Sequence, residues 1–286
     1  MLKAHRTSHG QNGRMTQEQL AEQLGVSVDA IGKYERSLSF IRGDLEYRLS
    51  DRLGWSQADV IACRKDWGAR RKPANSRYRL LDDTLVETVF EGSWRAACLA
   101  SIAMADAELH DLPSELEPNV DVFLPIYEIF RSHWAAIMCD GAMVAKWTLP
   151  FLLPEDEALF RAGRLIECDL SVDRLRRPIL PGTYFGYCPA LIVRPGHEAA
   201  SSLLMSSFVG FLETLAEREV FLHGLGTISV SPSGAQICRD IGMIRLGTHS
   251  LSPEFVVWNL PGSRIPGSIF GRRSTFLRQR YCEAFG

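Results

Sequence analysis

The strongest constraint on the fold lies near the start of the chain, where two short amphipathic segments are separated by only three residues. Thr16 and Gln19 have the spacing of a capping box, so a helix is predicted to begin there. Gly25 suits the left-handed backbone that ends a helix, and Ser27 is placed to cap a second one. Inward-facing residues recur at helical spacing, namely Leu20, Ala21, Leu24, Ala30, Ile31 and Tyr34. A third apolar set at Leu45, Leu49 and Leu53 completes a small helical core.

The charge of the chain is unevenly distributed. Residues 1–80 carry 15 Lys and Arg against 9 Asp and Glu, whereas the remainder carries 17 against 25. A basic N-terminal end on an acidic body predicts that one end meets a polyanion and the other does not.

The string TQ-x-x-LA-x-x-LGVS-x-x-x-I-x-x-YE-R, from Thr16 to Arg36, resembles the Cro and phage-repressor (XRE) family of helix-turn-helix domains. The resemblance covers about residues 1–68. After Arg36 the family usually has Gly and then Pro, whereas this chain runs SLSFIRGDLEYRL, so the following loop is expected to be reshaped.

This resemblance implies a DNA-binding surface. The second helix of such a module lies in the major groove, and its first residues meet base edges. The residues expected to contact DNA are Gln17, Ser27, Val28, Asp29, Gly32, Lys33, Arg36 and Arg42. The expected partner is a double-stranded DNA operator, bound by a homodimer on two half-sites.

Helical and strand patterns alternate from about residue 115. The segment 120–138 is predicted to be one amphipathic helix, and GAMVAKWTLPFLL a strand. A strand at TYFGYCPALIVRP precedes a long apolar helix at 197–219, and a short helix lies between Ser231 and Gly242. The predicted fold is an all-α helix-turn-helix domain followed by an α/β (α+β) domain with a mixed central sheet. The predicted boundaries are 1–70 for the DNA-binding domain, 71–112 for a linker and helices, and 113–286 for the α/β domain.

The order of strand, Arg-Pro turn, long helix, strand and SPSG helix resembles the GNAT acetyltransferase superfamily over roughly 115–260. In that family a glycine-rich turn binds the pyrophosphate of acyl-CoA through backbone N–H groups. The matching residues here are Arg194, Gly196, His197 and Ala199, which makes acetyl-CoA or another acyl-CoA the candidate ligand. His197 replaces the central glycine, Glu198 adds negative charge and Pro195 removes an N–H, so each weakens anion binding. Cys238 stands where the family often has a tyrosine general acid.

Other chemistry has weaker signals in the sequence. The histidines lack metal-ligand spacing, so no metal is expected. Glu128 and Glu167 are candidate general bases, but the sequence does not determine their geometry. Seven scattered cysteines, an odd number without a C-x-x-C pair, favour reduced thiols. With neither a signal peptide nor a predicted membrane span, a cytoplasmic protein is expected.

Three functions remain open from the sequence. The main hypothesis is a sequence-specific transcriptional regulator whose GNAT-like domain, non-catalytic because its cofactor turn is altered, serves as a sensor or dimerisation unit. The alternative is an acyl-CoA-dependent N-acyltransferase that carries a DNA-binding module. A third hypothesis is a sensor that binds acyl-CoA without turnover, so that ligand occupancy changes DNA affinity.

Overall fold

The computed structural model describes residues 2–9, 14–35, 43–56, 58–60, 62, 77–109, 112–117 and 119–286. The chain divides into two compact units, Met1–Ser76 and Arg77–Gly286. Each unit has hydrophobic clusters of its own, one in the N-terminal unit and two in the C-terminal unit.

The described part of the N-terminal unit is helical: α1 (Leu2–Ser8), α2 (Gln17–Leu24), α3 (Val28–Glu35) and α4 (Gly43–Leu53). The predicted capping box is confirmed, because the Thr16 hydroxyl accepts from the Gln19 N–H and the Gln19 side chain accepts from the Thr16 N–H. Gly25 ends α2 with a φ of 65°, and the Ser27 hydroxyl caps α3. Leu20, Leu24 and Ile31 are fully buried at the centre.

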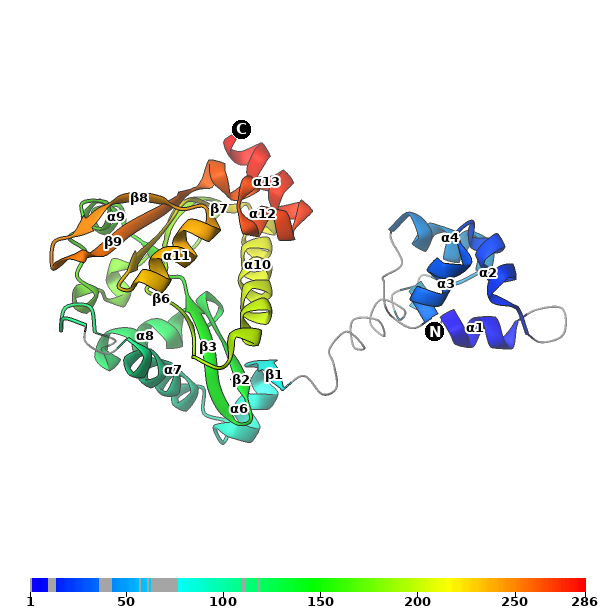
Figure 1. Ribbon diagram of the computed structural model, residues 1–286, viewed down its shortest axis with the longest axis horizontal. Helices are drawn as coiled ribbons and strands as arrows, with labels where there is room; N and C mark the ends of the chain where they lie inside the picture. Colours follow the sequence, from blue (N-terminus) through cyan, green and yellow to red (C-terminus); the bar gives the residue numbers. More distant parts are fainter. Residues whose placement is uncertain are drawn as a thin grey trace. The chain divides into compact units, whose positions relative to one another are not determined.

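The C-terminal unit is built on two sheets (Figure 1). The first is antiparallel, in the order β1 (Tyr78–Leu80), β2 (Trp134–Cys139), β3 (Ala142–Thr148) and β6 (Ala190–Val193). The second is mixed, in the order β4 (Phe151–Leu152), β5 (Gly182–Tyr187), β7 (Val220–Ser229), β9 (Ser252–Pro261) and β8 (Ile244–His249). The prediction of an α+β domain is therefore confirmed, with two sheets where one central sheet was expected.

Helices cover both faces of the first sheet. On one face α10 (Ser201–Glu217) packs on β2 and β3, where Trp147 and Ala145 point. On the other face lie α7 (Trp94–Glu108) and α8 (Val120–Ile129), which share a core with Ala136 and Met138. Alternate residues of β2 and β3 thus belong to two separate cores, as the two-residue period of a strand requires. The remaining helices are α6 (Asp83–Val89), α9 (Pro154–Arg161), α11 (Pro232–Ile241), α12 (Ile269–Arg273) and α13 (Thr275–Phe285).

The single helix predicted over 120–138 is wrong in its second half. The helix ends at Ile129, and Trp134–Cys139 is the strand β2, which pairs with β1 and β3. The apolar residues of this segment fit the period of a helix as well as that of a strand. Hydrogen-bonded pairing on both edges favours the strand.

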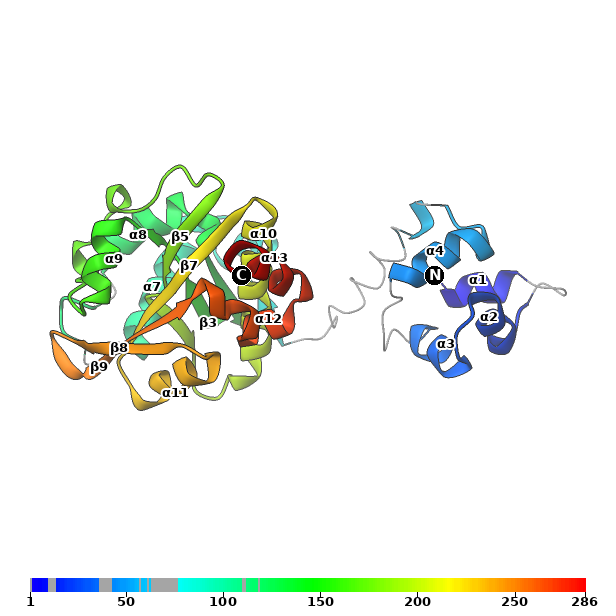
Figure 2. The same cartoon turned by 90° about the horizontal axis from the view of Figure 1, so that it is seen from above.

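The predicted strand TYFGYCPALIVRP is divided in two at Cys188–Pro189. Before the break, β5 runs parallel to β7, with which it pairs as far as Tyr187 and Gly226; the two lie side by side in Figure 2. After the break, β6 pairs antiparallel with β3, from Ala190 opposite Thr148 to Val193 opposite Ala145. Proline has no N–H to continue a ladder, which is consistent with a change of partner at this position.

One segment, Glu198–Glu217, is long and apolar enough to cross a membrane by length and composition. It comprises a short 3-10 turn, Glu198–Ala200, and α10. Leu204, Phe208 and Leu212 of α10 are buried in the core between the sheet and α12. This burial is typical of a core helix in a globular domain.

Candidate functional site

The candidate site begins where the chain between β5 and β6 leaves β7. The Cys188 N–H still donates to the Gly226 carbonyl at 2.8 Å, and the Thr227 hydroxyl donates to the Cys188 carbonyl at 2.7 Å. Beyond these bonds β6 turns to β3, whereas β7 continues to Ser229 alongside β9. Two strands that diverge from a common point leave a wedge between them.

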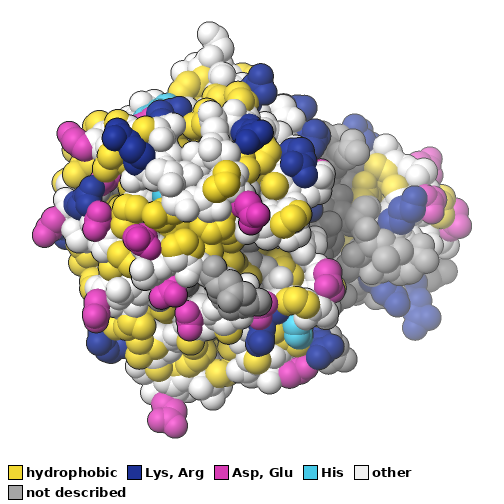
Figure 3. All heavy atoms as spheres, turned by 60° about the vertical axis from the view of Figure 1, so that its left-hand side comes forward, with side chains coloured by type: hydrophobic (Ala, Val, Ile, Leu, Met, Phe, Trp, Pro, Cys, Tyr) yellow, Lys and Arg dark blue, Asp and Glu magenta, His cyan; other side chains and the backbone are white. Residues whose placement is uncertain are grey.

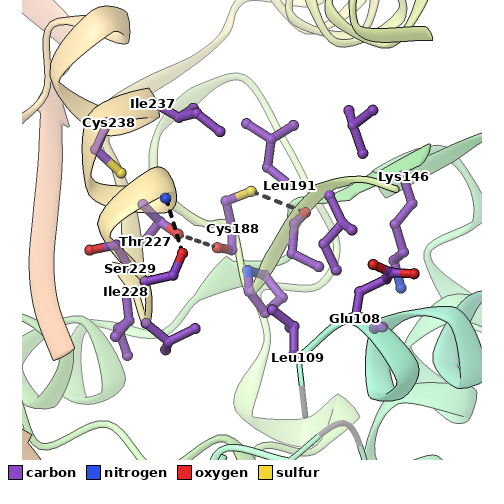
Figure 4. Close-up of a pocket in the computed structure, with 18 of the residues that line it drawn as sticks. Glu108, Leu109, Lys146, Cys188, Leu191, Thr227, Ile228, Ser229, Ile237 and Cys238 are labelled. Carbon is purple, nitrogen blue, oxygen red and sulfur yellow. Dashed lines mark hydrogen bonds between the residues drawn. The ribbon is translucent and has the colours of Figure 1, made fainter. Parts of the chain in front are cut away.

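This wedge contains a cavity of about 340 Å³, within the usual range of small-molecule sites. Figure 4 shows Cys188 at its middle, with Ile237 and Cys238 of α11 on one side and Lys146 and Glu108 on the other. Most of the lining is apolar, from β6, β7, α7, α10 and α11. The face of the unit in Figure 3 carries exposed hydrophobic side chains interspersed with acidic and basic ones.

A fully buried lysine lies against this apolar cavity. Lys146, in the middle of β3, has no exposed surface. Its Nζ donates to the Ser101 carbonyl and to the Tyr127 hydroxyl, both at 2.9 Å. Tyr127 Oη lies 3.0 Å from Thr148 Oγ1, and the Lys146 amine also lies over the Tyr127 ring. A buried amine is costly unless it is held in this way, so these contacts orient Lys146 rigidly at the cavity wall.

Glu167 is a buried carboxyl group in the lining of the same cavity. It lies in a 3-10 turn, Glu167–Asp169, and accepts a hydrogen bond from the buried Tyr187 hydroxyl of β5. Burial raises the pKa of Glu167 to about 7, although the Tyr187 hydrogen bond and the charge of Lys146 act in the opposite direction. Burial, together with the Glu167 charge, raises the pKa of Tyr187 well above its ordinary value. A carboxyl group that titrates near neutral pH and faces a cavity is suited to general acid and base catalysis.

The turn predicted to bind acyl-CoA lies at the end of β6, and two carboxylates already engage it. The Arg194 guanidinium donates to Glu108 of α7 at 2.7 Å. The Gly196 N–H donates to the Glu198 carboxylate at 2.9 Å, and Gly196 has a φ of 80°. His197 is half-buried and its ring lies edge-to-face with the ring of Tyr78, and Ala199 is exposed in the 3-10 turn that follows. Of the four predicted residues, none lines the cavity, although the neighbouring Val193 and Pro195 do.

Cys238, the predicted general acid, does line the cavity. It is buried on α11, and burial raises the pKa of its thiol to about 12. The thiol formed from the leaving group has an ordinary pKa of ~8.5, well below that of Cys238, so proton transfer from Cys238 to the leaving thiolate would be strongly uphill. This environment suits Cys238 to packing better than to acid catalysis.

The residues predicted to contact DNA lie on α2 and α3 where the structure describes them. The Gln17 amide donates to Glu35, which also accepts from Arg6, and Asp29 pairs with Lys33 at 2.6 Å. Val28 is exposed, Ser27 caps α3 and Gly32 lies within α3. Arg36 and Arg42 lie outside the described residues.

No family model and no curated protein matches the sequence. Among solved structures, the C-terminal condensation domain of Ebony in complex with beta-alanyl-dopamine matches at 13% identity and a TM-score of 0.37, over 64% of this chain and 98% of that one. The AHL synthase LasI matches at 13% identity and 0.28, over 45% and 63%. A protein described as a "putative acetyltransferase" matches at 12% identity and 0.31, over 73% and 94%. These TM-scores are below 0.5, so the chemistry of this chain has to be argued from its own residues.

The comparisons contradict the main hypothesis drawn from the sequence. By name, the three neighbours are of acyltransferase type and none is a DNA-binding protein; they favour the alternative, an acyltransferase, and the transcriptional regulator is not retained. The predicted partners, a DNA operator and a second copy of the chain, are contradicted by the same neighbours. No comparison identifies the N-terminal helices as an XRE helix-turn-helix domain.

Most of the buried polar cluster carries no motif in the sequence. The sequence marks Glu167 as a candidate base but gives no motif for Lys146, Tyr127 or Tyr187. The sequence does contain one signal, because Lys146 interrupts the apolar run AMVAKWTLP. A strand buried on both faces leaves no exposed side for a charged residue, so such a lysine must be held by partners inside the protein. Glu128, the other candidate base, instead pairs with Arg95 at the surface. Within the described ranges, no group of three or more His, Cys, Asp or Glu is arranged to hold a metal ion.

Proposed function

We propose that the C-terminal unit is an acyltransferase that moves an acyl group from a thioester to an amine. The observation that carries this proposal is the pairing of an apolar cavity between diverging strands with a buried carboxyl group, Glu167, that titrates near pH 7. The apolar walls suit an acyl thioester, and the carboxyl group suits the proton transfers that aminolysis requires.

Glu167 is able to serve both proton transfers. The neutral amine nitrogen forms a bond to the thioester carbonyl carbon and becomes positively charged, and Glu167, as a carboxylate, then accepts a proton from that nitrogen. When the carbon–sulfur bond breaks, Glu167 passes this proton to the leaving thiolate. The carboxyl group at about 7 is a stronger acid than a thiol at ~8.5, so this transfer is downhill. The products are an amide and a free thiol, and Glu167 ends as it began.

Lys146 and Tyr187 control the ionisation and the orientation of the Glu167 carboxyl group. Tyr187 donates to Glu167 and so fixes the orientation of its carboxyl plane. Lys146 favours the ionised form of Glu167 through its charge. Without these two groups, burial alone would raise the pKa of Glu167 further and leave less carboxylate at neutral pH.

The direct test is thiol release. The full chain is incubated with acyl-CoA donors and a panel of primary amines, and free thiol is measured with a thiol-reactive dye while the amide is identified by mass spectrometry. Amine-dependent thiol release with stoichiometric amide supports the proposal. Absence of both, with every donor and acceptor and with a correctly folded chain, would refute it.

The carboxylate of Glu198 should weaken acyl-CoA binding at the turn, so its removal should raise the affinity. Glu198→Ala removes the acceptor that engages the Gly196 N–H and a negative charge beside it. We expect CoA to bind about threefold to tenfold more tightly, with the gain shrinking as salt is raised. Calorimetry measures this, and Glu217→Ala, which removes an exposed charge at the far end of α10, is the matched control. Equal affinities in the two variants would show that the turn does not meet the CoA phosphates.

A further inference from the structure

The cavity is lined from both faces of the sheets. Its lining includes residues of the core beneath α10 and residues of the separate core beneath α7 and α8. These two cores are divided by β2 and β3 elsewhere in the unit. At the wedge, β6 and β7 are not paired with each other, so the cavity continues between the strands from one face to the other.

The two ends of the cavity differ in chemistry. The end toward α7 and α8 holds Glu108, Lys146 and Glu167. The end toward α10, which we call the apolar arm, is lined by Met205, Phe208, Leu225, Ile241, Met243 and Phe270. No charged side chain is among the described residues that line the apolar arm. A substrate that fills both ends must therefore be polar at one end and hydrocarbon at the other.

We infer that the apolar arm receives the hydrocarbon chain of a medium-length acyl group, of about six to ten carbons, during the acyl transfer proposed above. The cavity of about 340 Å³ has room for roughly eleven groups of the size of a water molecule, each of ~30 Å³. A methylene group is of similar size, and part of the volume belongs to the polar end. An acetyl group would leave most of the apolar arm unfilled, so the van der Waals contacts with the side chains that line the arm would be lost.

The geometry also places the reacting carbonyl group. A chain that lies in the apolar arm, with its acceptor beside Glu167, must cross between the strands near Cys188 and Thr227, where β6 and β7 diverge. The thioester carbonyl carbon then lies at the crossing, between the hydrocarbon end and the proton-transfer end. The acceptor is thereby restricted to amines small enough to fit beside Lys146 and Glu167.

Binding of unreactive analogues tests the apolar arm separately from catalysis. S-alkyl pantetheine thioethers, from S-ethyl to S-dodecyl, are titrated into the full chain by calorimetry. We expect affinity to rise up to about fourfold for each added methylene until the arm is full, so that S-octyl binds at least 30-fold more tightly than S-ethyl, with no further gain beyond about S-decyl.

Two substitutions on α10 make the test specific. Met205→Trp narrows the apolar arm and is expected to move the best chain length down by two or more carbons, whereas Met205→Ala is expected to move it up. Leu203→Trp is the matched control, because Leu203 is half-buried on the same helix but does not line the cavity. Should Met205→Trp fail to fold, Met205→Ala still tests the opposite shift.

Equal affinity for S-ethyl and S-octyl thioethers would overturn the inference, as would identical chain-length profiles for the Met205 variants and the control. A clear chain-length preference without any amide formation would instead leave the apolar arm in place and refute the proposed acyl transfer. The two failures are therefore distinguishable.

Discussion

Replacing Glu167 with Gln is expected to lower kcat for acyl transfer by about 10²- to 10⁴-fold, the usual contribution of a general acid–base group. Gln has nearly the same shape and can still accept the hydrogen bond that Tyr187 donates. The substitution therefore removes the ionisable group without opening a cavity. Steady-state thiol release measures the change, and thioether binding, measured in parallel, should stay within about threefold.

The pH dependence of the rate distinguishes a proton-transfer role from a structural one. Because the pKa of Glu167 is about 7, kcat/KM in the wild-type chain should rise with pH through that value as the carboxylate forms. Glu167→Gln should lack this limb of the profile. Glu128→Gln, at a half-exposed carboxylate paired with Arg95, is the control and should keep both the rate and the limb. A Glu167→Gln variant with more than half of the wild-type rate would exclude Glu167 as the base.

The same carboxyl group should make the fold less stable as the pH rises. Its pKa is about 7 in the folded state and 4.5 as the ordinary value, so the folded chain holds a proton that the unfolded chain has already lost. The contribution of Glu167 to the free energy of unfolding is fully present below pH 4.5 and is lost as the pH rises through 7. Each pKa unit corresponds to 1.36 kcal/mol, so titration of Glu167 lowers the free energy of unfolding by about 3 kcal/mol between pH 4.5 and pH 8.

Another buried group opposes this effect, so the measurement must be a comparison of variants. Burial lowers the pKa of His133 to about 4, and stability from this residue is lost as the pH falls from 6.5 through 4. The two contributions overlap and have opposite signs. Urea unfolding of the wild-type chain and of Glu167→Gln, followed by tryptophan fluorescence from pH 4.5 to 8, cancels the His133 contribution. A difference between the two chains that does not change with pH would show that Glu167 is not a buried, titrating carboxyl group.

Much of the local structure could be predicted because it depends on short-range chemistry. The Thr16 capping box, the left-handed Gly25 and the helix from Ser231 to Gly242 are all present as expected. Each is set by hydrogen bonds or backbone preferences within four residues, which are visible in the sequence. The prediction over 120–138 failed at Trp134–Cys139, where β1 and β3 supply the pairing partners from elsewhere in the chain.

Function was harder to predict than fold. The N-terminal string resembles a DNA-binding family, and the hypothesis of a transcriptional regulator depends on that string alone. The alternative, an acyltransferase, depends on the order of elements after residue 115, which concerns most of the chain. A motif confined to about a quarter of the residues does not specify the chemistry of the rest.

By itself the sequence determined where helices begin and end near their caps, and the presence of a mixed helix-and-sheet domain. Only the tertiary structure decided where the chemistry lies. Glu167 lies 21 positions after Lys146, and Tyr187 lies 20 positions after Glu167. Only the fold places Lys146 and Glu167 at one cavity and Tyr187 in hydrogen-bond contact with Glu167. The raised pKa of Glu167 has the same origin, because desolvation depends on what surrounds a carboxyl group in space, and neighbours in sequence do not specify that.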